Sequence, residues 1–328
     1  MSLEDLTPDE WKLLHRATTP GFIEPMKAVL TEERFSDPAW IFERKLDGIR
    51  CEAIKSNGTV RLLSRNDLSL NGRYPEIAAA LDRDRAEDVV VDGEVVAFEG
   101  SRTSFEKLAR RGHQRVAVFL YVFDVMHLDG YDTRQLPLRG RKRLLRRALD
   151  FVGPVRLTPY RNRDGEALFR DACRTGWEGL IAKRADSRYT SARSRDWLKF
   201  KCAAEQELVV GGHTDPKGSR AELGALLVGY FDDGRLRYAG KVGTGFDRET
   251  LRDLSRRLRP LRRERSPFAD ADVRERGVHW VEPKLVVQVG FTEWTRDGRL
   301  RHPRFLGVRE DKAARDVVRE RPAAAAAS

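Results

Sequence analysis

A lysine stands two residues before an Asp-Gly turn near the start of the chain. Lys45 is followed by Leu46-Asp47-Gly48, and Glu43 precedes it by two residues. The amine of a lysine can attack an electrophile once it has lost its proton. If the segment is a strand that ends at the turn, Glu43 and Lys45 share one face, because side chains alternate along a strand. The segment predicts a nucleophile, and other residues must supply its deprotonation and its electrophile.

Carboxylates occur in two segments that are otherwise apolar. Asp92 and Glu94 lie on one face of the strand pattern at residues 89–96, and Glu178 precedes the short apolar run 179–182. A buried carboxylate is unfavourable unless it is paired, hydrogen-bonded or bound to a metal. Carboxylate oxygens are suitable ligands for a divalent cation. These segments therefore supply carboxylates for a metal-dependent reaction.

Two lysines and one aromatic residue are further candidates for functional side chains. Lys199 and Lys201 alternate with Leu198 and Phe200, so both lysines point to the same face of a strand. Their repulsion is tolerable on a solvated surface, and it becomes useful if an anion lies between them. Phe123 ends an apolar strand and could stack on a base, although ordinary core packing is the better explanation when this residue is considered alone. Together these side chains suit a nucleotide.

Composition limits the partners and the compartment. The chain has 328 residues, 34% of them charged, and a formal net charge of +11, which favours a polyanion such as nucleic acid but also fits an ordinary basic surface. Cys51, Cys173 and Cys202 are odd in number and far apart, so we expect no disulfide and no zinc site. The N-terminus lacks a signal pattern, and no apolar run approaches the ~20 residues that cross a bilayer. These features predict a cytoplasmic protein without a membrane partner.

Hydrophobic patterns predict an α+β chain with two domains. In the first region, turns interrupt strands too often for regular βαβ units, which favours antiparallel sheets. A capping signal at Thr7 predicts a short helix at the N-terminus. Strands are expected at 40–43, 60–63, 89–98 and 116–126, and helices at 74–81, 105–110, 141–149 and 166–174.

A second region of short strands begins near Ala203. Strands are expected at 207–212, 224–231, 236–242 and 284–294, with one helix at 249–258. This pattern fits a small barrel such as the OB-fold and a small β-sandwich equally well. The predicted domains are 1–203, which includes the short helical segment at its start, and 204–316. A low-complexity tail covers 317–328.

The order of these motifs resembles the ATP-dependent DNA ligase family of covalent nucleotidyltransferases, and within it the ligase module of bacterial end-joining DNA ligases. No GxxxxGK[ST], GxGxxG, HExxH or GxSxG motif competes with it. The resemblance covers residues from about Pro25 to Lys312. It implies an OB-fold, and not a β-sandwich, for the second domain. The segments that carry it are Lys45-Leu46-Asp47-Gly48, Ser64-Arg65-Asn66, Asp92-Gly93-Glu94, the strand of Phe123, 178–183, 197–201, 238–246 and 301–312.

The resemblance implies a mechanism for Lys45. It would attack the α-phosphate of ATP, expel pyrophosphate and carry AMP before passing it to a 5'-phosphate of DNA. Lys199 and Lys201 would contact the α-phosphate, and with the metal they would lower the pKa of Lys45. Glu94 and Glu178 would serve the ribose and a divalent metal, Mg2+ or Mn2+.

The resemblance also assigns nucleotide-binding residues and a moving domain. The second domain would close over the nucleotide and then grip DNA, with a hinge near residues 202–204. The implied roles are adenine stacking for Phe123, adenine-edge recognition for Glu43, pocket closure for Lys183, ribose and 5'-phosphate binding for Arg50 and Arg65, and pyrophosphate contact for Arg309, Asp311 and Lys312.

The expected substrate is duplex DNA with nicks or breaks, sealed during repair such as end joining. Basic residues on loops of the second domain, namely Lys217, Arg220 and Lys241, would follow the DNA backbone. The chain has no room for a separate N-terminal DNA-binding domain, a polymerase or a nuclease, so we expect DNA-end-binding proteins to recruit it and the chain itself to be a monomer. The alternatives are an RNA ligase or capping guanylyltransferase, and a DNA-end binding module without catalysis.

Overall fold

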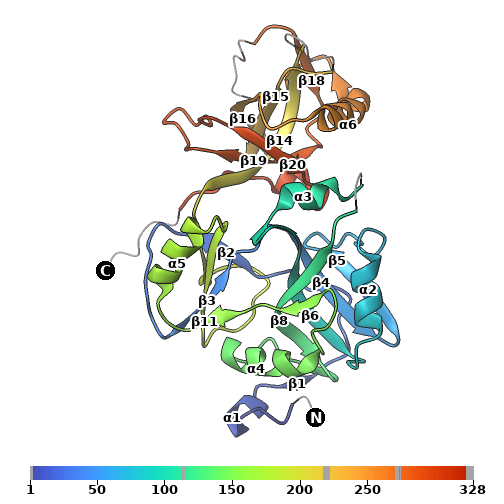
Figure 1. Ribbon diagram of the computed structural model, residues 1–328, viewed down its shortest axis with the longest axis vertical. Coiled ribbons are helices and arrows are strands. Elements are labelled where there is room, and N and C mark those ends of the chain that lie inside the picture. The colour runs from blue at the N-terminus through green and yellow to red at the C-terminus, as the bar shows by residue number, and fades with distance from the viewer. Residues whose placement is uncertain (1–2, 113–114, 217–221, 270–272, 274, 323–328) are drawn as a thin grey trace. The chain divides into compact units, whose positions relative to one another are not determined.

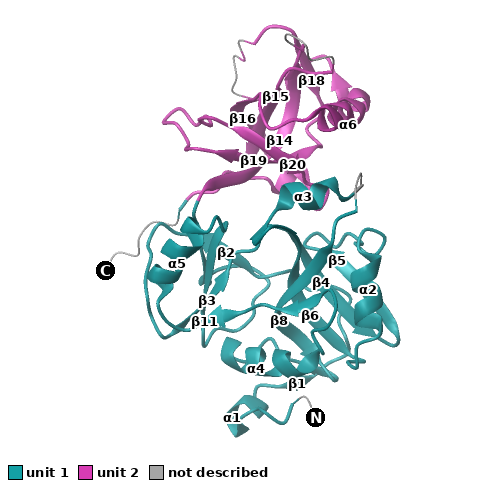
Figure 2. Cartoon of the chain, viewed as in Figure 1, with its two compact units in different colours: residues 1–202, 322–328 teal, residues 203–321 magenta. Residues whose placement is uncertain are grey.

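The chain folds into two compact units. Unit 1 is Met1–Cys202 with Pro322–Ser328, and unit 2 is Ala203–Arg321 (Figure 2). No helix within the described ranges is long and apolar enough to cross a membrane. Both units combine helices with sheets whose strands are mainly antiparallel, which confirms the predicted α+β class. The computed structural model describes residues 3–112, 115–216, 222–269, 273 and 275–322.

The first sheet of unit 1 provides its largest core. Across the sheet the strands are β1 (His15–Arg16), β9 (Tyr131–Asp132), β8 (Val118–Leu128), β6 (Val89–Glu99), β4 (Ile49–Ser56) and β5 (Thr59–Ser64), with β10 (Val155–Leu157) beside β8 and β7 (Arg102–Thr103) beside β6 (Figure 1). Strands β6 and β8 are buried along most of their length, which explains their continuous apolar runs.

The second sheet of unit 1 is buried on both faces. Its strands are β11 (Tyr160–Arg161), β3 (Trp40–Arg44), β12 (Gly179–Arg184), β13 (Arg193–Lys201) and β2 (Lys27–Leu30). On one face, Phe42 and Phe200 pack with Leu168 from the helix Gly165–Arg174. On the other face, Trp197 packs with Phe123 of the first sheet. The inner face of this sheet therefore looks toward the first sheet.

The helices of unit 1 lie close to their predicted positions. The helix predicted at 141–149 begins earlier, at Leu138, because Pro137 occupies its N-cap and starts the first turn. Thr7 and Glu10 form the predicted capping box. The helices are α1 (Pro8–Trp11), α2 (Pro75–Asp82), α3 (Phe105–Ala109), the 3-10 turn η1 (Arg110–Gly112), α4 (Leu138–Ala148) and α5 (Gly165–Arg174).

Unit 2 is a curled antiparallel sheet with one α-helix among its described residues. The core combines Leu208 and Val287 of the sheet with Leu254 of the helix. Two strands pair with different parts of the long strand β14 (Ala204–Thr214), which bends the sheet. The elements are β14 (Ala204–Thr214), β15 (Leu226–Asp232), β16 (Arg235–Val242), α6 (Arg248–Leu258), η2 (Arg259–Leu261), β17 (Arg262–Arg263), β18 (Val278–Val281), β19 (Val286–Phe291), β20 (Arg304–Val308) and η3 (Ala314–Asp316).

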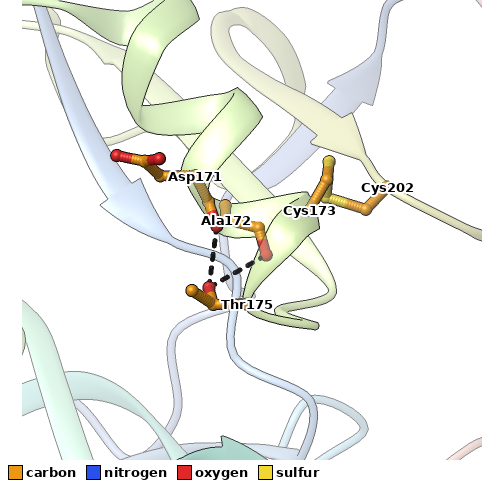
Figure 3. Close-up of a disulfide and its surroundings, with 5 residues drawn as sticks. All are labelled: Asp171, Ala172, Cys173, Thr175 and Cys202. Carbon is orange, nitrogen blue, oxygen red and sulfur yellow. Dashed lines mark hydrogen bonds between the residues drawn. A yellow bond between two sulfur atoms is a disulfide. The ribbon is translucent and has the colours of Figure 1, made fainter.

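The expectation that the cysteines form no disulfide is wrong. Cys173, on the last turn of α5, is bonded to Cys202, with a Cα–Cα distance of 5.2 Å (Figure 3). The two residues are 29 positions apart, and spacing alone gave no sign that folding brings them together. Cys202 also donates its backbone N–H to the carbonyl oxygen of Glu178 at 3.0 Å. The remaining cysteine, Cys51, is free and buried.

The first residues of the predicted tail belong to unit 2. Val317 is 1% exposed, and Gln206 accepts a hydrogen bond from the backbone N–H of Glu320 at 3.0 Å. The side-chain amide of Gln206 in turn donates to the carbonyl oxygen of Val318 at 3.0 Å. A tail that begins at 317 is therefore placed too early, because Val317 fills the core of unit 2. Residues 323–328 lie outside the described part of the chain.

Candidate active site

One face of the second sheet brings together predicted residues from three strands. The pairing of β3, β12 and β13 aligns Glu43 with Ile181, and Ile181 with Lys199. Residues directly opposite each other on paired strands point to the same face. Glu43 and Lys199 are 2% and 9% exposed. The shared face predicted within each strand is thus one continuous surface across the sheet.

Lys45 lies at the end of this face, one residue after β3. Its backbone N–H donates to the carbonyl oxygen of Gly179 at 2.9 Å, and Gly179 pairs with Lys201. Gly179 has a φ of 148°, and a Cβ there would lie 1.8 Å from the carbonyl oxygen of Phe200. Only glycine fits this position. Lys45 and Lys201 therefore flank a residue that has no side chain.

An ion pair holds the amine of Lys45. Its Nζ contacts Oε1 of Glu178, which directly precedes β12, and the two side chains are 19% and 9% exposed. Burial alone would lower the pKa of Lys45, but the Glu178 carboxylate, with smaller effects from Asp47 and Glu94, raises it. The expectation of a lowered pKa is therefore wrong for the protein's own groups, because carboxylates dominate the charges around the amine.

Glu178 also carries an oxygen that suits a cation. Its Oε2 is buried and has no hydrogen-bond partner in the part of the chain that the structure describes. Glu94, on β6, lies close enough to raise the pKa of both Lys45 and Arg50. No group of three or more His, Cys, Asp or Glu side chains among the described residues could hold a metal ion by itself. The two carboxylates fit Mg2+ or Mn2+, since such ions usually take phosphate oxygens and water as further ligands.

Phe123 lies at a β-bulge of β8. Gly93 pairs with Val122 and Asp92 pairs with Asp124, so Phe123 is the extra residue between them. A bulge redirects side chains locally. The ring is 7% exposed and belongs to an apolar cluster that includes residues of the second sheet. The bulge thus turns Phe123 toward the inner face of the second sheet, as base stacking would require.

Arg50 is fixed by a network behind this aromatic ring. Its guanidinium donates two hydrogen bonds to Asp92 and lies 4.7 Å from the centre of the Phe123 ring. The hydroxyl of Tyr189 donates to the same carboxylate at 2.6 Å. Burial would lower the pKa of Arg50, but Asp92, together with Tyr189 and Glu94, raises it. Strand pairing places Arg50 directly opposite Glu94.

Glu43 lies between two buried lysines. Its Oε2 is 2.8 Å from Nζ of Lys183 on β12, and its Oε1 pairs with Lys142 on α4. The Lys183 amine is also 4.1 Å from the ring centre of Phe123 and 3.9 Å from that of Trp197. Burial lowers the pKa of Lys183 to about 8; Glu43 opposes this shift and Lys142 adds to it. The structure thus brings Glu43, Lys183 and Phe123 together.

Arg65 lies at the edge of the first sheet. It follows β5, whose last residue, Ser64, pairs with Cys51 of β4. Cys51 is the neighbour of Arg50, so the two predicted arginines stand at the same end of adjacent strands. Arg65 is half-buried.

The predicted residues of unit 2 form one cluster. Arg309 donates to both oxygens of Asp311, at 2.9 and 2.8 Å, and these residues are 9% and 2% exposed. Lys312 donates to Glu207 at 3.0 Å, and Arg309 lies 4.0 Å from the same carboxylate. Glu207 on β14 therefore holds the cluster together.

The basic loop residues predicted for unit 2 are only partly described. Lys241 is paired with Glu275 at 2.8 Å. Lys217 and Arg220 lie outside the described residues.

Sequence reasoning missed several residues of the site. Lys142, Tyr189 and Glu207 contact predicted residues, and Arg141 is fully buried while it donates to both oxygens of Asp124. The sequence of α4 is rich in arginine and lysine between its leucines, so it has the pattern of a solvated basic helix. The acidic partners of Arg141 and Lys142 are Asp124 and Glu43, which lie on other elements. No local signal in the sequence identifies these pairs.

Family models match both units. Residues 24–201 match the model described as ATP dependent DNA ligase domain, and residues 219–312 match the model described as ATP dependent DNA ligase C terminal region. The multifunctional non-homologous end joining protein LigD of Pseudomonas aeruginosa is 40% identical over 314 residues, which cover 93% of this chain and 37% of that protein. The LigD protein of Mycobacterium tuberculosis is 37% identical over 287 residues, covering 86% of this chain and 37% of that protein. The chain thus spans 37% of the length of these curated relatives.

A solved structure shows the same architecture. The structure described as mycobacterial DNA ligase D complexed with ATP and MES aligns with a TM-score of 0.65 and 34% identity, over 91% of this chain and 98% of that chain. This likeness confirms the predicted fold, a nucleotidyltransferase domain followed by an OB-fold domain. The β-sandwich alternative for the second region is wrong.

Proposed function

Because the chain belongs to the ATP-dependent DNA ligase family, as its motifs predict, we propose that it seals nicks or breaks in duplex DNA through an AMP adduct on Lys45. The observation that supports this proposal best is the position of Lys45. It stands at the end of a face that carries Lys199 and Lys201, next to a glycine that leaves space, and against Glu178.

The first step transfers AMP from ATP to the lysine. The Nζ of Lys45 loses a proton and attacks the α-phosphorus, a P–N bond forms, and the P–O bond to pyrophosphate breaks. Lys199 and Lys201 favour this step because their charges offset the negative charge that develops on the α-phosphate. The ion pair with Glu178 must weaken before the amine can attack, since it favours the protonated form.

Glu178 and Glu94 are the residues that would hold a divalent metal. The buried, unpartnered Oε2 of Glu178 supports this assignment. A bound Mg2+ or Mn2+ would neutralise phosphate charge and draw the Glu178 carboxylate away from the amine. Glu43, Phe123 and Lys183 would bind the adenine, and Arg50 and Arg65 the ribose.

Two further steps complete the sealing. A phosphate oxygen at the 5' end of the break attacks the phosphorus of the adduct, which breaks the P–N bond and frees Lys45. The 3'-hydroxyl then attacks the 5'-phosphorus, and AMP leaves as the new phosphodiester forms. Arg309, Asp311 and Lys312 would act on pyrophosphate in the first step, which requires unit 2 to close over the nucleotide and reopen for DNA.

Labelling with radioactive ATP and magnesium tests the proposal. The wild-type chain should acquire one covalent AMP, and Lys45→Ala should abolish it. Lys27→Ala is the matched control, because Lys27 forms an exposed ion pair with Glu24 outside the site. A folded wild-type chain that is never labelled would overturn the proposal.

Sealing assays separate the remaining alternatives. An RNA ligase would prefer RNA ends, and a capping guanylyltransferase would label with GTP in preference to ATP. A DNA-end binding module would bind nicked duplex without labelling or sealing. We expect ATP-dependent sealing of a 5'-phosphate and 3'-hydroxyl nick in duplex DNA, with end-binding proteins as further partners at double-strand breaks.

A further inference from the structure

A lysine outside the predicted motifs contacts the base end of the proposed nucleotide pocket. Lys142, on α4, is 1% exposed and forms an ion pair with Oε1 of Glu43. The other carboxylate oxygen of Glu43 faces Lys183 at 2.8 Å. Lysines from two different elements thus contact the two oxygens of the Glu43 carboxylate.

Lys142 is itself held in place by an aromatic ring. Its Nζ lies 5.2 Å from the centre of the Tyr160 ring, and β11 pairs Tyr160 directly opposite Glu43. A cation near an aromatic face is stabilised by the ring quadrupole. Arg146, one turn further along α4, lies at the same distance from Tyr160 and donates to its hydroxyl at 2.9 Å, but it is exposed. Arg146 therefore shares the helix and the ring with Lys142 but not the carboxylate.

Charge balance alone does not require Lys142. One buried lysine, Lys183, already matches the charge of Glu43, and a second buried ammonium has to be desolvated as well. The second charge also opposes protonation of Lys183. What Lys142 adds is direction, because two donors on opposite oxygens fix the plane of the carboxylate.

We infer that Lys142 is a positioning residue that acts through Glu43 and sets the preference of the site for adenine over guanine. This inference rests on the proposed function, in which Glu43 reads the base. A carboxylate accepts a hydrogen bond from the exocyclic amine of adenine, whereas the exocyclic oxygen of guanine is an acceptor and is repelled. Without Lys142, only Lys183 contacts the Glu43 carboxylate, which can then rotate. The preference for adenine over guanine should therefore fall.

Binding of ATP and of GTP to Lys142→Met tests the inference. The measurements use the Lys45→Ala background, so that no covalent adduct forms and the affinities report the pocket alone. We expect ATP affinity to fall about tenfold, which is about 1.4 kcal/mol, while GTP affinity changes little, because only adenine donates a hydrogen bond to the Glu43 carboxylate. In the chain with Lys45 intact, the KM for ATP should rise more than kcat falls. Arg146→Met is the matched control and should leave both affinities unchanged.

A double-mutant cycle decides whether Lys142 acts through Glu43. In a Glu43→Gln background, Lys142→Met should change ATP affinity no further. Unchanged selectivity in Lys142→Met, or a full additional effect in the Glu43→Gln background, would overturn the inference. If Lys142→Met does not unfold cooperatively, Lys142→Leu, which likewise cannot donate to Glu43, is measured in its place and the same outcomes apply. If the wild-type chain is labelled with AMP but Lys142→Met keeps the wild-type selectivity for ATP over GTP, only the inference is refuted. If the wild-type chain is not labelled, the proposed function is refuted.

Discussion

The two carboxylate oxygens of Glu178 lie in different environments, and only one of them contacts Lys45. Its Oε1 pairs with the amine of Lys45, while its Oε2 is buried and has no hydrogen-bond partner among the described residues. The first contact raises the pKa of Lys45 against the effect of burial. A cation on the second oxygen would weaken the first contact. The same residue can therefore keep the nucleophile protonated until the metal and the nucleotide arrive.

Glu178→Gln should change two properties of Lys45 in opposite directions. Loss of the carboxylate lowers the pKa of Lys45, so acylation of this amine by a small amine-reactive reagent should become faster at pH 8. AMP transfer from ATP should become about 10- to 100-fold slower, because the proposed metal ligand is lost. Mass spectrometry of the modified lysine and AMP labelling measure the two rates. Glu24→Gln, at an exposed ion pair with Lys27, should change neither, and slower acylation in Glu178→Gln would contradict the assignment.

Gly179→Ala should destabilise unit 1. The new Cβ would lie 1.8 Å from a backbone oxygen of Phe200, at a φ of 148° that side chains rarely adopt. We expect the free energy of unfolding to fall by at least about 2 kcal/mol. Urea denaturation measures the change. Gly72→Ala is the control, because nothing lies within 4 Å of its Cβ position, and it should stay within about 1 kcal/mol of the wild type.

Glu52 should make the chain less stable as the pH rises. Burial raises the pKa of this carboxyl to about 8, with Asp92 and Asp67 adding to the shift, although the backbone N–H of Ile23 donates to it at 3.0 Å. The native state then binds one proton more than the unfolded state between about pH 4.5 and 8. The free energy of unfolding should therefore fall by up to about 1.4 kcal/mol per pH unit in this window.

Glu52→Gln tests this pH dependence. The glutamine oxygen can still accept the hydrogen bond from Ile23, so only the titration is removed. The variant should be more stable than the wild type at pH 8 and close to it at pH 5, as measured by urea denaturation at both values. An equal difference between variant and wild type at the two pH values would show that Glu52 does not titrate in this range.

The disulfide should stabilise the oxidised chain. It closes a loop between Cys173 and Cys202, which are 29 residues apart. Restriction of the unfolded chain by a loop of this size is worth about 3–4 kcal/mol in the chain-entropy description. Reduction by a dithiol, or the double change Cys173→Ser with Cys202→Ser, should lower the unfolding free energy by up to that amount.

Thiol titration checks the disulfide directly. In denaturant without reductant, the oxidised chain should expose one thiol, that of Cys51, and after reduction three. The double serine variant should respond to the dithiol no further. Three titratable thiols before reduction would show that the bond is not formed.

Short-range patterns along the sequence predicted much of the fold and several relationships within the site. Alternation within single strands placed Glu43 and Lys45 on one face, and Lys199 and Lys201 on another, before any pairing was known. Strand pairing joined these faces into one. The helix limits were also close, since caps and turns are local signals. The tail was placed too early because Val317 is buried by residues far away in the chain.

What the sequence by itself determined is a set of candidate reactive residues and the family to which the chain belongs. Tertiary structure alone decided which partners these residues meet: Glu178 against Lys45, Lys142 against Glu43, the bulge that turns Phe123, and the bond between Cys173 and Cys202. The physical reason is distance along the chain. Alternation and capping depend on neighbouring residues, whereas ion pairs, bulges and disulfides depend on the register and packing of elements that only the complete fold brings together.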